Sequence, residues 1–124
     1  MKVAVTSSGR SLDSAVDPRF GRCACFVVVE TGDMSFEAVD NGAVSLGGGA
    51  GIQSARLVAE RGATVVLTGN VGPNAHQALS AAGIQVVTGC SGTVAEAVER
   101  FKAGGLAAAA GPTVGSHSGM GGRG

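Results

Sequence analysis

The chain has no tryptophan and no tyrosine, and phenylalanine supplies only four of its 124 residues. Proteins that bind single-stranded nucleic acids use aromatic side chains on which bases stack, and proteins that follow a phosphate backbone need an excess of basic residues. Here nine Lys and Arg balance nine Asp and Glu. The composition therefore argues against a nucleic-acid partner.

Long apolar runs are lacking too. No run approaches the ~18 residues of a membrane span, and Met1 to Ser8 has neither the length nor the small-residue cleavage site of a secretory signal. We expect a cytoplasmic protein that makes no membrane contact. In a reducing compartment its three cysteines are expected to be thiols, metal ligands or core residues rather than disulfides.

Glycine is abundant, with 22 residues, and it falls into two populations. Eight of the 22 lie between Gly104 and Gly124, where few bulky apolar residues can bury surface. We expect a flexible Gly/Ala-rich tail over 104–124. The other glycines punctuate apolar runs over residues 1–103, which we expect to form one domain, and they resemble turn and ligand-loop glycines.

Alternating periodicities predict a single α/β domain. Valine-rich and alternating runs predict five strands, at Lys2–Thr6, Cys25–Glu30, Ser35–Asp40, Thr64–Thr68 and Gln85–Thr88. Helical spacing predicts three helices, from Gly51 to Arg61, from Pro73 to the residue before Gly83, and after a capping box at Thr93–Glu96. The order implies a five-stranded mixed sheet with one antiparallel strand and helices on both faces.

Each predicted helix has an apolar stripe that should face the sheet. The three stripes are Ile52, Ala55, Val58 and Ala59, then Ala75, Ala78, Leu79 and Ala82, then Val94, Ala97, Val98 and Phe101.

Ligands of open α/β sheets bind beyond the carboxyl ends of the parallel strands. The loops that should meet there are 6–10, 46–51, 68–73 and 88–93, and the last three lead directly into helices. Three helix N-termini and many backbone N–H groups would favour an anion, with Arg19 and Arg22 close by. The alternative is that these glycines only serve tight turns. No dinucleotide or P-loop fingerprint is present, so a nucleotide stays an open alternative without positive support.

The cysteines are the candidate metal ligands. Cys90 precedes the last helix, whose N-terminus would stabilise a thiolate, with a passive buried cysteine as the alternative. Cys23 and Cys25 should face the same side of an extended strand, although two sulfurs alone do not complete a tetrahedral site. His76, in the first turn of its helix, faces either the ligand edge or solvent. No carboxylate cluster or Ser/His/Asp arrangement indicates an enzyme.

Five ordered motifs resemble the dinitrogenase iron-molybdenum cofactor biosynthesis family over about residues 1–106. The motifs are Met1–Val5, Val16–Arg22, Gly48–Gly51, Gly72–Ala75 and Ser91–Glu96. The resemblance implies a ribonuclease H-like topology without the nuclease carboxylates. It also implies a carrier or scaffold for an iron-molybdenum-sulfur precursor. The orange-protein branch of the family holds a molybdenum-copper sulfide cluster non-covalently and is associated with ParA/MinD-type ATPases.

The resemblance and the predicted ligand edge coincide. Many members of the family carry a histidine in the Gly-rich loop, and its absence from Leu46–Ala50 favours non-covalent binding. Two hypotheses follow: a non-catalytic carrier of an anionic metal-sulfur cluster that works with donor or acceptor proteins, and a regulatory module that binds a nucleotide or an ATPase partner. The candidate cofactor-binding residues are Arg10, Arg22, Gly48, Gly49, Gly51, Gly72, Asn74, His76, Ser91, Gly92 and Thr93, and the candidate metal ligands are Cys90, Cys23 and Cys25.

Overall fold

The computed structural model describes residues 1–42 and 50–104. Their elements follow the order β1 (Lys2–Ser7), β2 (Cys25–Glu30), β3 (Phe36–Asp40), α1 (Ala50–Glu60), β4 (Val65–Leu67), α2 (Pro73–Ala81), β5 (Gln85–Val87) and α3 (Val94–Lys102). This is the predicted succession, with shifts of one or two residues at most boundaries. The predicted loop at 46–49 and the predicted tail beyond residue 104 lie outside the described residues.

The five strands form one mixed sheet in the order β3-β2-β1-β4-β5. β2 runs antiparallel to both of its neighbours, whereas β1, β4 and β5 are parallel to one another. β3 therefore points in the same direction as β1. The predicted fold class, a single α/β domain of ribonuclease H-like topology with one antiparallel strand, is confirmed.

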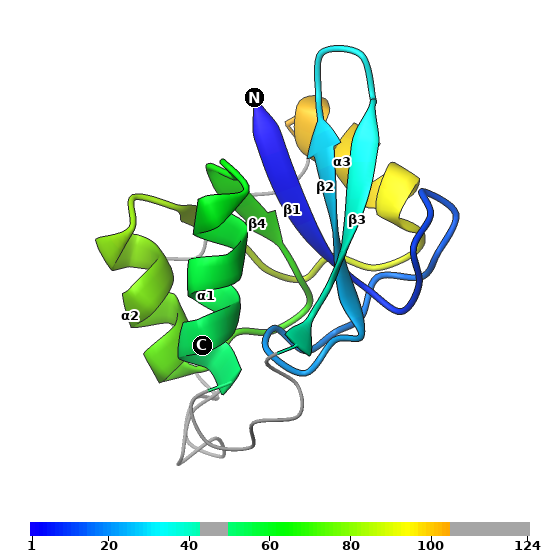
Figure 1. Ribbon diagram of the computed structural model, residues 1–124. Helices are drawn as coiled ribbons and strands as arrows, with labels where there is room; N and C mark the ends of the chain where they lie inside the picture. The colour runs from blue at the N-terminus through cyan, green and yellow to red at the C-terminus, as the bar shows by residue number, and fades with distance from the viewer. Residues whose placement is uncertain (43–49, 105–124) are drawn as a thin grey trace.

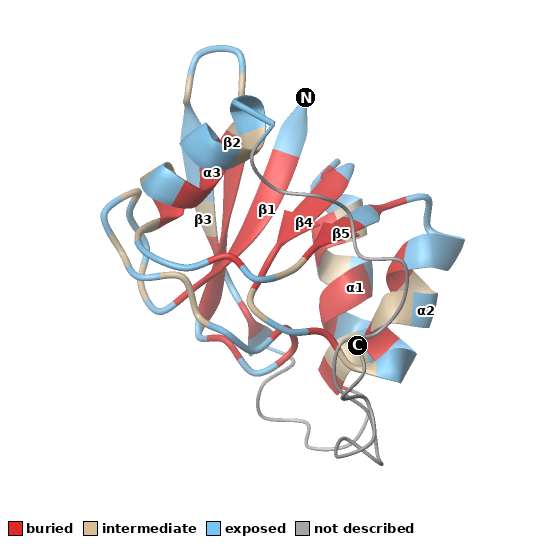
Figure 2. Ribbon diagram, turned by 180° about the vertical axis from the view of Figure 1, so that it is seen from behind, coloured by how far each residue is buried: buried red, intermediate tan, exposed pale blue. Residues whose placement is uncertain are grey.

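The helices cover both faces of the sheet (Figure 1). α1 and α2 pack on one face, where Ala55, Val58 and Leu79 meet Ala4 and Phe26 of the sheet. α3 packs on the other face through the residues Val94, Ala97 and Val98, against Val3, Val5, Val27 and Val29. Because β1 and β2 are covered on both faces, they read as continuous apolar runs in the sequence. Figure 2 shows this burial through the middle of the sheet.

Two residues of the predicted helix stripes are not in the core. Ile52 keeps 44% of its surface exposed, because the buried face of α1 is turned toward Ser54, which is fully buried. The apolar pattern placed Ile52 on the buried face of α1 and did not include Ser54, because serine is not apolar. This part of the prediction is wrong. Ala82 is exposed because it is the C-cap residue of α2, beyond the last full turn.

The segment 8–24, which showed no periodicity, crosses the edge of the sheet where the parallel strands end. Short bridges hold it there, pairing Ala15 with Thr93 and Arg19 with Asn70. Within the part of the chain that the structure describes, no helix is long and apolar enough to cross a membrane.

Candidate functional site

The carboxyl ends of β1, β3, β4 and β5 meet at one edge of the sheet, and β2 begins there. We call this edge the rim; it comprises residues 8–24, Asn41, Ala50–Gly51, 68–75 and 88–93. It lies at the bottom of Figure 1, where α1 and α2 also begin. The sequence predicted that these loops converge. The convergence requires β3 to run parallel to β1, as it does.

Arg19 is fixed on the rim by backbone hydrogen bonds on both sides. The amide of Asn70 donates to the carbonyl of Pro18 at 2.7 Å, and the amide of Phe20 donates to the carbonyl of Asn70 at 3.3 Å. Gly69 allows this approach, because a Cβ at that position would lie 2.7 Å from the Cα of Pro18. The chain around Arg19 is therefore held against the loop that follows β4.

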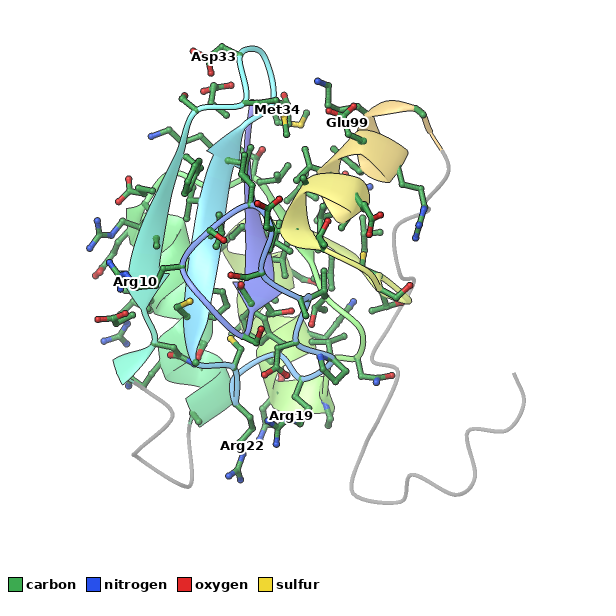
Figure 3. All side chains as sticks on the ribbon, turned by 90° about the vertical axis from the view of Figure 1, so that its right-hand side faces the viewer. Arg10, Arg19, Arg22, Asp33, Met34 and Glu99 are labelled. Carbon is green, nitrogen blue, oxygen red and sulfur yellow. The ribbon has the colours of Figure 1, made fainter. Side chains whose placement is uncertain are left out.

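Two arginines project from the rim. Figure 3 shows Arg19 and Arg22 at the same end of the molecule, pointing away from the sheet. The Arg19 side chain is 65% exposed and has one weak ion pair, with Asp17 at 3.4 Å. Arg22 is exposed and makes no ion pair with any described residue. The sequence predicts both arginines near the rim, although only Arg22 is among the candidate cofactor-binding residues.

The N-terminus of α2 opens onto the rim without a side-chain cap. Its N-cap is Gly72, and Pro73 in the first turn has no N–H to donate. The amides of Asn74 and Ala75 find no hydrogen-bond acceptor among the described residues, whereas the amide of His76 donates to the carbonyl of Gly72 at 2.9 Å. Two N–H groups at the positive end of a helix are thus available to an anion.

The first amides of α3 are already hydrogen-bonded within the protein. The expectation that three open helix N-termini meet at the rim is therefore corrected, because the N-terminus of α3 is not open. The amides of Val94 and Ala95 donate to the carbonyls of Ser14 and Leu12, both at 2.9 Å. The amide of Glu96 donates to the Thr93 hydroxyl at 3.1 Å, which completes the predicted capping box. Only the tertiary fold brings residues 12–14 to this helix.

Two other candidates lie in the turn before α3. Ser91 and Gly92 are exposed, but the carbonyl of Gly92 accepts a hydrogen bond from the amide of Val16. The turn is therefore bound to the crossing segment rather than open to a ligand along its whole length.

The N-terminus of α1 lies against both the crossing segment and α2. A Cβ on Gly51 would lie 3.0 Å from the Cβ of Ala75, so the first turns of the two helices are in close contact. α1 begins at Ala50, and the candidates Gly48 and Gly49 lie outside the described residues. Gly51 is therefore the one member of the Gly-rich motif candidates that the structure places at the rim.

Arg10 points elsewhere. Its guanidinium pairs with the carboxylate of Asp40 and donates to the carbonyl of Ala38 at 3.4 Å, both on the edge strand β3. In Figure 3 it lies beside β3, away from Arg19 and Arg22. Its charge is committed to Asp40, and we do not retain Arg10 as part of the anion site.

Cys23 and Cys25 do not face the same side, contrary to the expectation. β2 begins only at Cys25, so strand alternation does not extend back to Cys23, which packs in the core beneath α1 and α2. The Cys25 thiol instead donates to the carbonyl of Gly9 at 2.6 Å. Burial raises the pKa of Cys23 to about 12, and burial also raises the pKa of Cys25.

Cys90 is buried, with 6% exposure, in the core under α3. Its thiol donates to the carbonyl of Val87 at 3.7 Å. Burial raises the pKa of this thiol, and a hydrogen bond with Thr68 and the charge of Arg100 offset only part of that rise. The burial and the raised pKa favour a passive buried cysteine over a thiolate stabilised by the helix N-terminus. Among the described residues, no group of three His, Cys, Asp or Glu is arranged to hold a metal ion.

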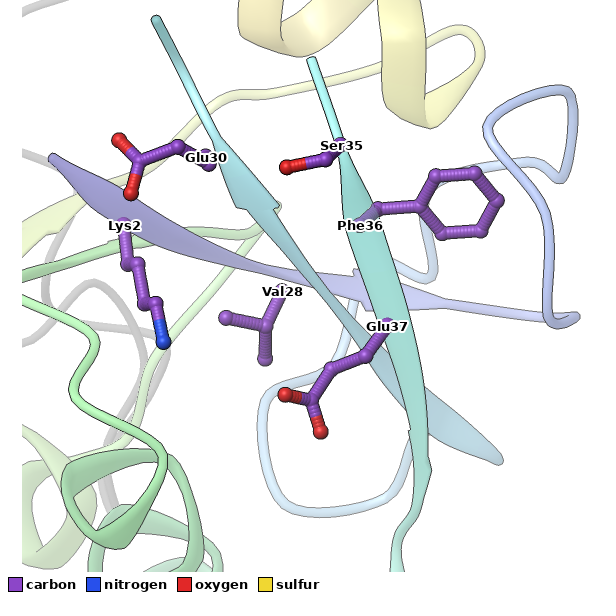
Figure 4. Close-up of a pocket in the computed structure, with 6 residues that line it drawn as sticks. All are labelled: Lys2, Val28, Glu30, Ser35, Phe36 and Glu37. Atoms are coloured by element: carbon purple, nitrogen blue, oxygen red, sulfur yellow. The ribbon is translucent and has the colours of Figure 1, made fainter. Parts of the chain in front are cut away.

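Two hollows lie apart from the rim. One, of about 200 Å³, is at the opposite end of the sheet, and Figure 4 shows Lys2, Glu30 and Glu37 around it. The N-terminal ammonium lowers the pKa of exposed Glu30 by direct hydrogen bonding. The other, of about 420 Å³, is an alanine-lined groove between α1 and α2. Neither contains the two rim arginines.

A buried polar network behind the rim escaped the sequence analysis. Asn41 and Ser54 are 3% and 0% exposed and hydrogen-bonded to each other, Ser54 Oγ donating to Asn41 Oδ1 at 3.1 Å. The sequence offers little signal for this pair, because Asn41 directly follows a strand and Ser54 is a polar residue within a helix.

Comparisons with known proteins support the fold and the family resemblance. The apo form of the orange protein from Desulfovibrio gigas is 53% identical, with a TM-score of 0.88 over 90% of this chain and 94% of that one. A candidate NifB protein from Thermotoga is 34% identical, with a TM-score of 0.76 over 86% of this chain and 91% of that one. An uncharacterised protein of Methanocaldococcus jannaschii is 31% identical over 86% of this chain and 89% of its own length.

The family described as "Dinitrogenase iron-molybdenum cofactor" matches residues 1–104, which includes every described element. The match covers the motifs around Arg22, Gly51, Gly72 and Thr93 that form or border the rim. This chain therefore belongs to the dinitrogenase iron-molybdenum cofactor family.

Proposed function

We propose that this protein is a non-catalytic carrier that holds an anionic metal-sulfur cluster on the rim. The observation that carries the proposal is the uncapped N-terminus of α2 at the same edge of the sheet as Arg19 and Arg22. Helix N-termini and guanidinium groups both favour anions, and backbone N–H groups can donate hydrogen bonds to sulfide as well as to oxygen. Family membership supports a role in cluster handling.

The cargo is held without a covalent protein ligand in this proposal. All three cysteines are buried, and burial raises the pKa of each thiol, so the nucleophilic thiolate that binds metals is disfavoured. The described residues also provide no three-ligand group. A sulfide-coated molybdenum-copper cluster brings its own metal ligands and needs only charge and hydrogen-bond complementarity. The resemblance to the orange-protein branch favours this cargo over an iron-molybdenum-sulfur precursor.

The same features support a carrier rather than an enzyme. Proton-transfer chemistry needs a general acid or base near the substrate, and the guanidinium and amide side chains of Arg19, Arg22 and Asn74 are not groups that usually serve as one. A carrier acts with a cluster donor or acceptor protein. An ATPase of the ParA/MinD type is the partner that the family resemblance suggests, and we place the carrier in the cytoplasm.

Cluster reconstitution tests the proposal. Apo-protein mixed with tetrathiomolybdate and copper should give a visible chromophore that stays with the protein through desalting. Iron with sulfide serves as the second loading arm, and metal analysis of protein purified from its source identifies the natural cargo. Colourless protein in every arm, together with metal-free native protein, would refute the carrier role.

Calorimetry distinguishes the cluster carrier from the alternative, a regulatory module that binds a nucleotide or an ATPase partner. Saturable binding of ATP or ADP, unaffected by Arg22→Gln and without any cluster binding, would favour a nucleotide-binding regulator. We expect no saturable nucleotide binding, because the described rim lacks a phosphate-cradling fingerprint and aromatic side chains for a base.

A further inference from the structure

The backbone on either side of Arg22 is bound by one buried side chain. The side-chain amide nitrogen of Asn41, Nδ2, donates to the carbonyl of Gly21 at 3.2 Å and to the carbonyl of Cys23 at 3.0 Å. It also lies 3.8 Å from the Cys23 sulfur. An exposed arginine thus sits between two carbonyls that are tied to the same buried amide group.

The orientation of Asn41 is itself fixed from two directions. Its backbone amide donates to the carbonyl of Ala24 at 3.0 Å, and its side-chain oxygen accepts from the hydroxyl of Ser54 in α1. Because Asn41 and Ser54 are almost completely buried, loss of one bond would leave a polar group without water to replace it. The network therefore has one strongly preferred arrangement.

The Gly21 backbone completes the arrangement. Its φ of +96° lies in the left-handed region that favours glycine, and it packs directly on the first turn of α1. The next residue, Arg22, points outward from the rim (Figure 3). The position of Arg22 relative to the helix N-termini is thereby set by contacts behind the rim.

We infer that Asn41, oriented by Ser54, is a positioning residue that holds Arg22 in place for the bound anion. The inference rests on the proposed function and adds to it the residues that pre-organise one of its two cations. A guanidinium held in place loses less conformational freedom on binding than one on a mobile loop, so affinity for the anion is higher. Neither Asn41 nor Ser54 needs to touch the anion.

A double-mutant cycle tests the inference, with tetrathiomolybdate alone as the probe at low ionic strength. Ser54→Ala and Asn41→Ala should each weaken binding by about threefold when Arg22 is present, an amount typical of coupled neighbours. In the Arg22→Gln background the same substitutions should have no further effect. Val98→Ala, which loosens the core under α3, is the matched destabilised control and should leave the dissociation constant unchanged.

An equal loss of affinity with and without Arg22, or no loss at all, would overturn the inference. A second readout does not need the anion: the heteronuclear NOE of the Arg22 amide should fall in Ser54→Ala and stay unchanged in Val98→Ala. If the wild-type protein fails to bind tetrathiomolybdate, the proposed function is decided by the copper and iron loading arms and by the metal content of the native protein. The inference itself is then decided by this NOE, and an Arg22 amide as ordered in Ser54→Ala as in the wild type would refute it.

Discussion

Gly21 and Gly51 touch so closely that a methyl group on Gly21 would lie 3.2 Å from the Cα of Gly51. The two glycines come from different motifs, one before Arg22 and one in the first turn of α1. Their contact brings the crossing segment against the helix and thus places a cation beside a helix N-terminus. These two family motifs are therefore linked by packing.

Gly21→Ala should destabilise the fold by about 1–2 kcal/mol, because an alanine at positive φ is strained and its methyl group would crowd α1. Urea unfolding measures the loss. Gly32→Ala is the control, since a Cβ there meets nothing within 4 Å in the hairpin turn. Equal stabilities of the two variants would contradict this account of Gly21.

Arg19→Gln and Arg22→Gln should each weaken tetrathiomolybdate binding by about tenfold at low ionic strength, as expected for loss of a charge-assisted hydrogen bond. Arg10→Gln should bind as the wild type does, because the Arg10 guanidinium is paired with Asp40 on β3. Isothermal titration gives the dissociation constants. A loss in Arg10→Gln as large as in Arg22→Gln would restore Arg10 to the site.

A variant with all three cysteines changed to serine should still retain the molybdenum-copper chromophore after desalting. The reason is that Cys23, Cys25 and Cys90 are buried and kept protonated by their surroundings. Loss of stability is checked by circular dichroism, and the single variant Cys90→Ser guards against a misfolded triple variant. Bleaching of the well-folded Cys90→Ser protein would show that a thiolate ligand is required.

Alkaline pH should destabilise the wild type more steeply than Cys23→Ala. The folded-state pKa of Cys23 is raised from 9.0 to about 12, so the unfolded chain loses this proton first. Its contribution to stability is complete below pH 9 and decreases between pH 9 and 12, by about 1.4 kcal/mol per pH unit. Urea unfolding at pH 8, 9.5 and 10.5 would measure the difference between the two proteins. Parallel pH profiles would mean that folding does not raise the pKa of Cys23.

Thr93→Ala should lower stability by about 1 kcal/mol, the usual contribution of an N-cap side chain. Anion affinity should change little, since the first amides of α3 are bonded to Leu12 and Ser14 instead of facing a ligand. Thermal unfolding and titration with tetrathiomolybdate check the two parts. Strongly weakened binding with unaltered stability would place the turn before α3 in the site.

The parts of the fold that the sequence predicted are those governed by local periodicity. The residues of β2 repeat an apolar pattern that needs both faces covered, and the Thr93–Glu96 capping box marks a helix start within four residues. β3 returns antiparallel to β2, as the short turn between the two strands requires. Ile52 was misjudged because the buried face of α1 includes a serine, Ser54.

The candidate site was predicted in outline and revised in detail. Four candidates lie at the rim as expected: Arg22, Gly51, Gly72 and Asn74. The first lies just before β2, and the others lie where a loop after a predicted strand leads into a helix. Arg10 belongs to one of the loops predicted at the rim, but its guanidinium forms an ion pair with Asp40 on β3. Such a choice depends on a residue 30 positions away, which no local pattern encodes.

By itself, the sequence determined the order of strands and helices, the rim where they converge and the family to which the chain belongs. The first two follow from side-chain periodicity, turn residues and helix caps, which act over a few residues, and the family follows from the five ordered motifs. Only the tertiary structure decided which helix ends stay open, which arginines are uncommitted and which thiols are buried. Those properties depend on long-range contacts, such as Ser14 with Val94 and Asn41 with Ser54, that exist only once the sheet and its helices have packed.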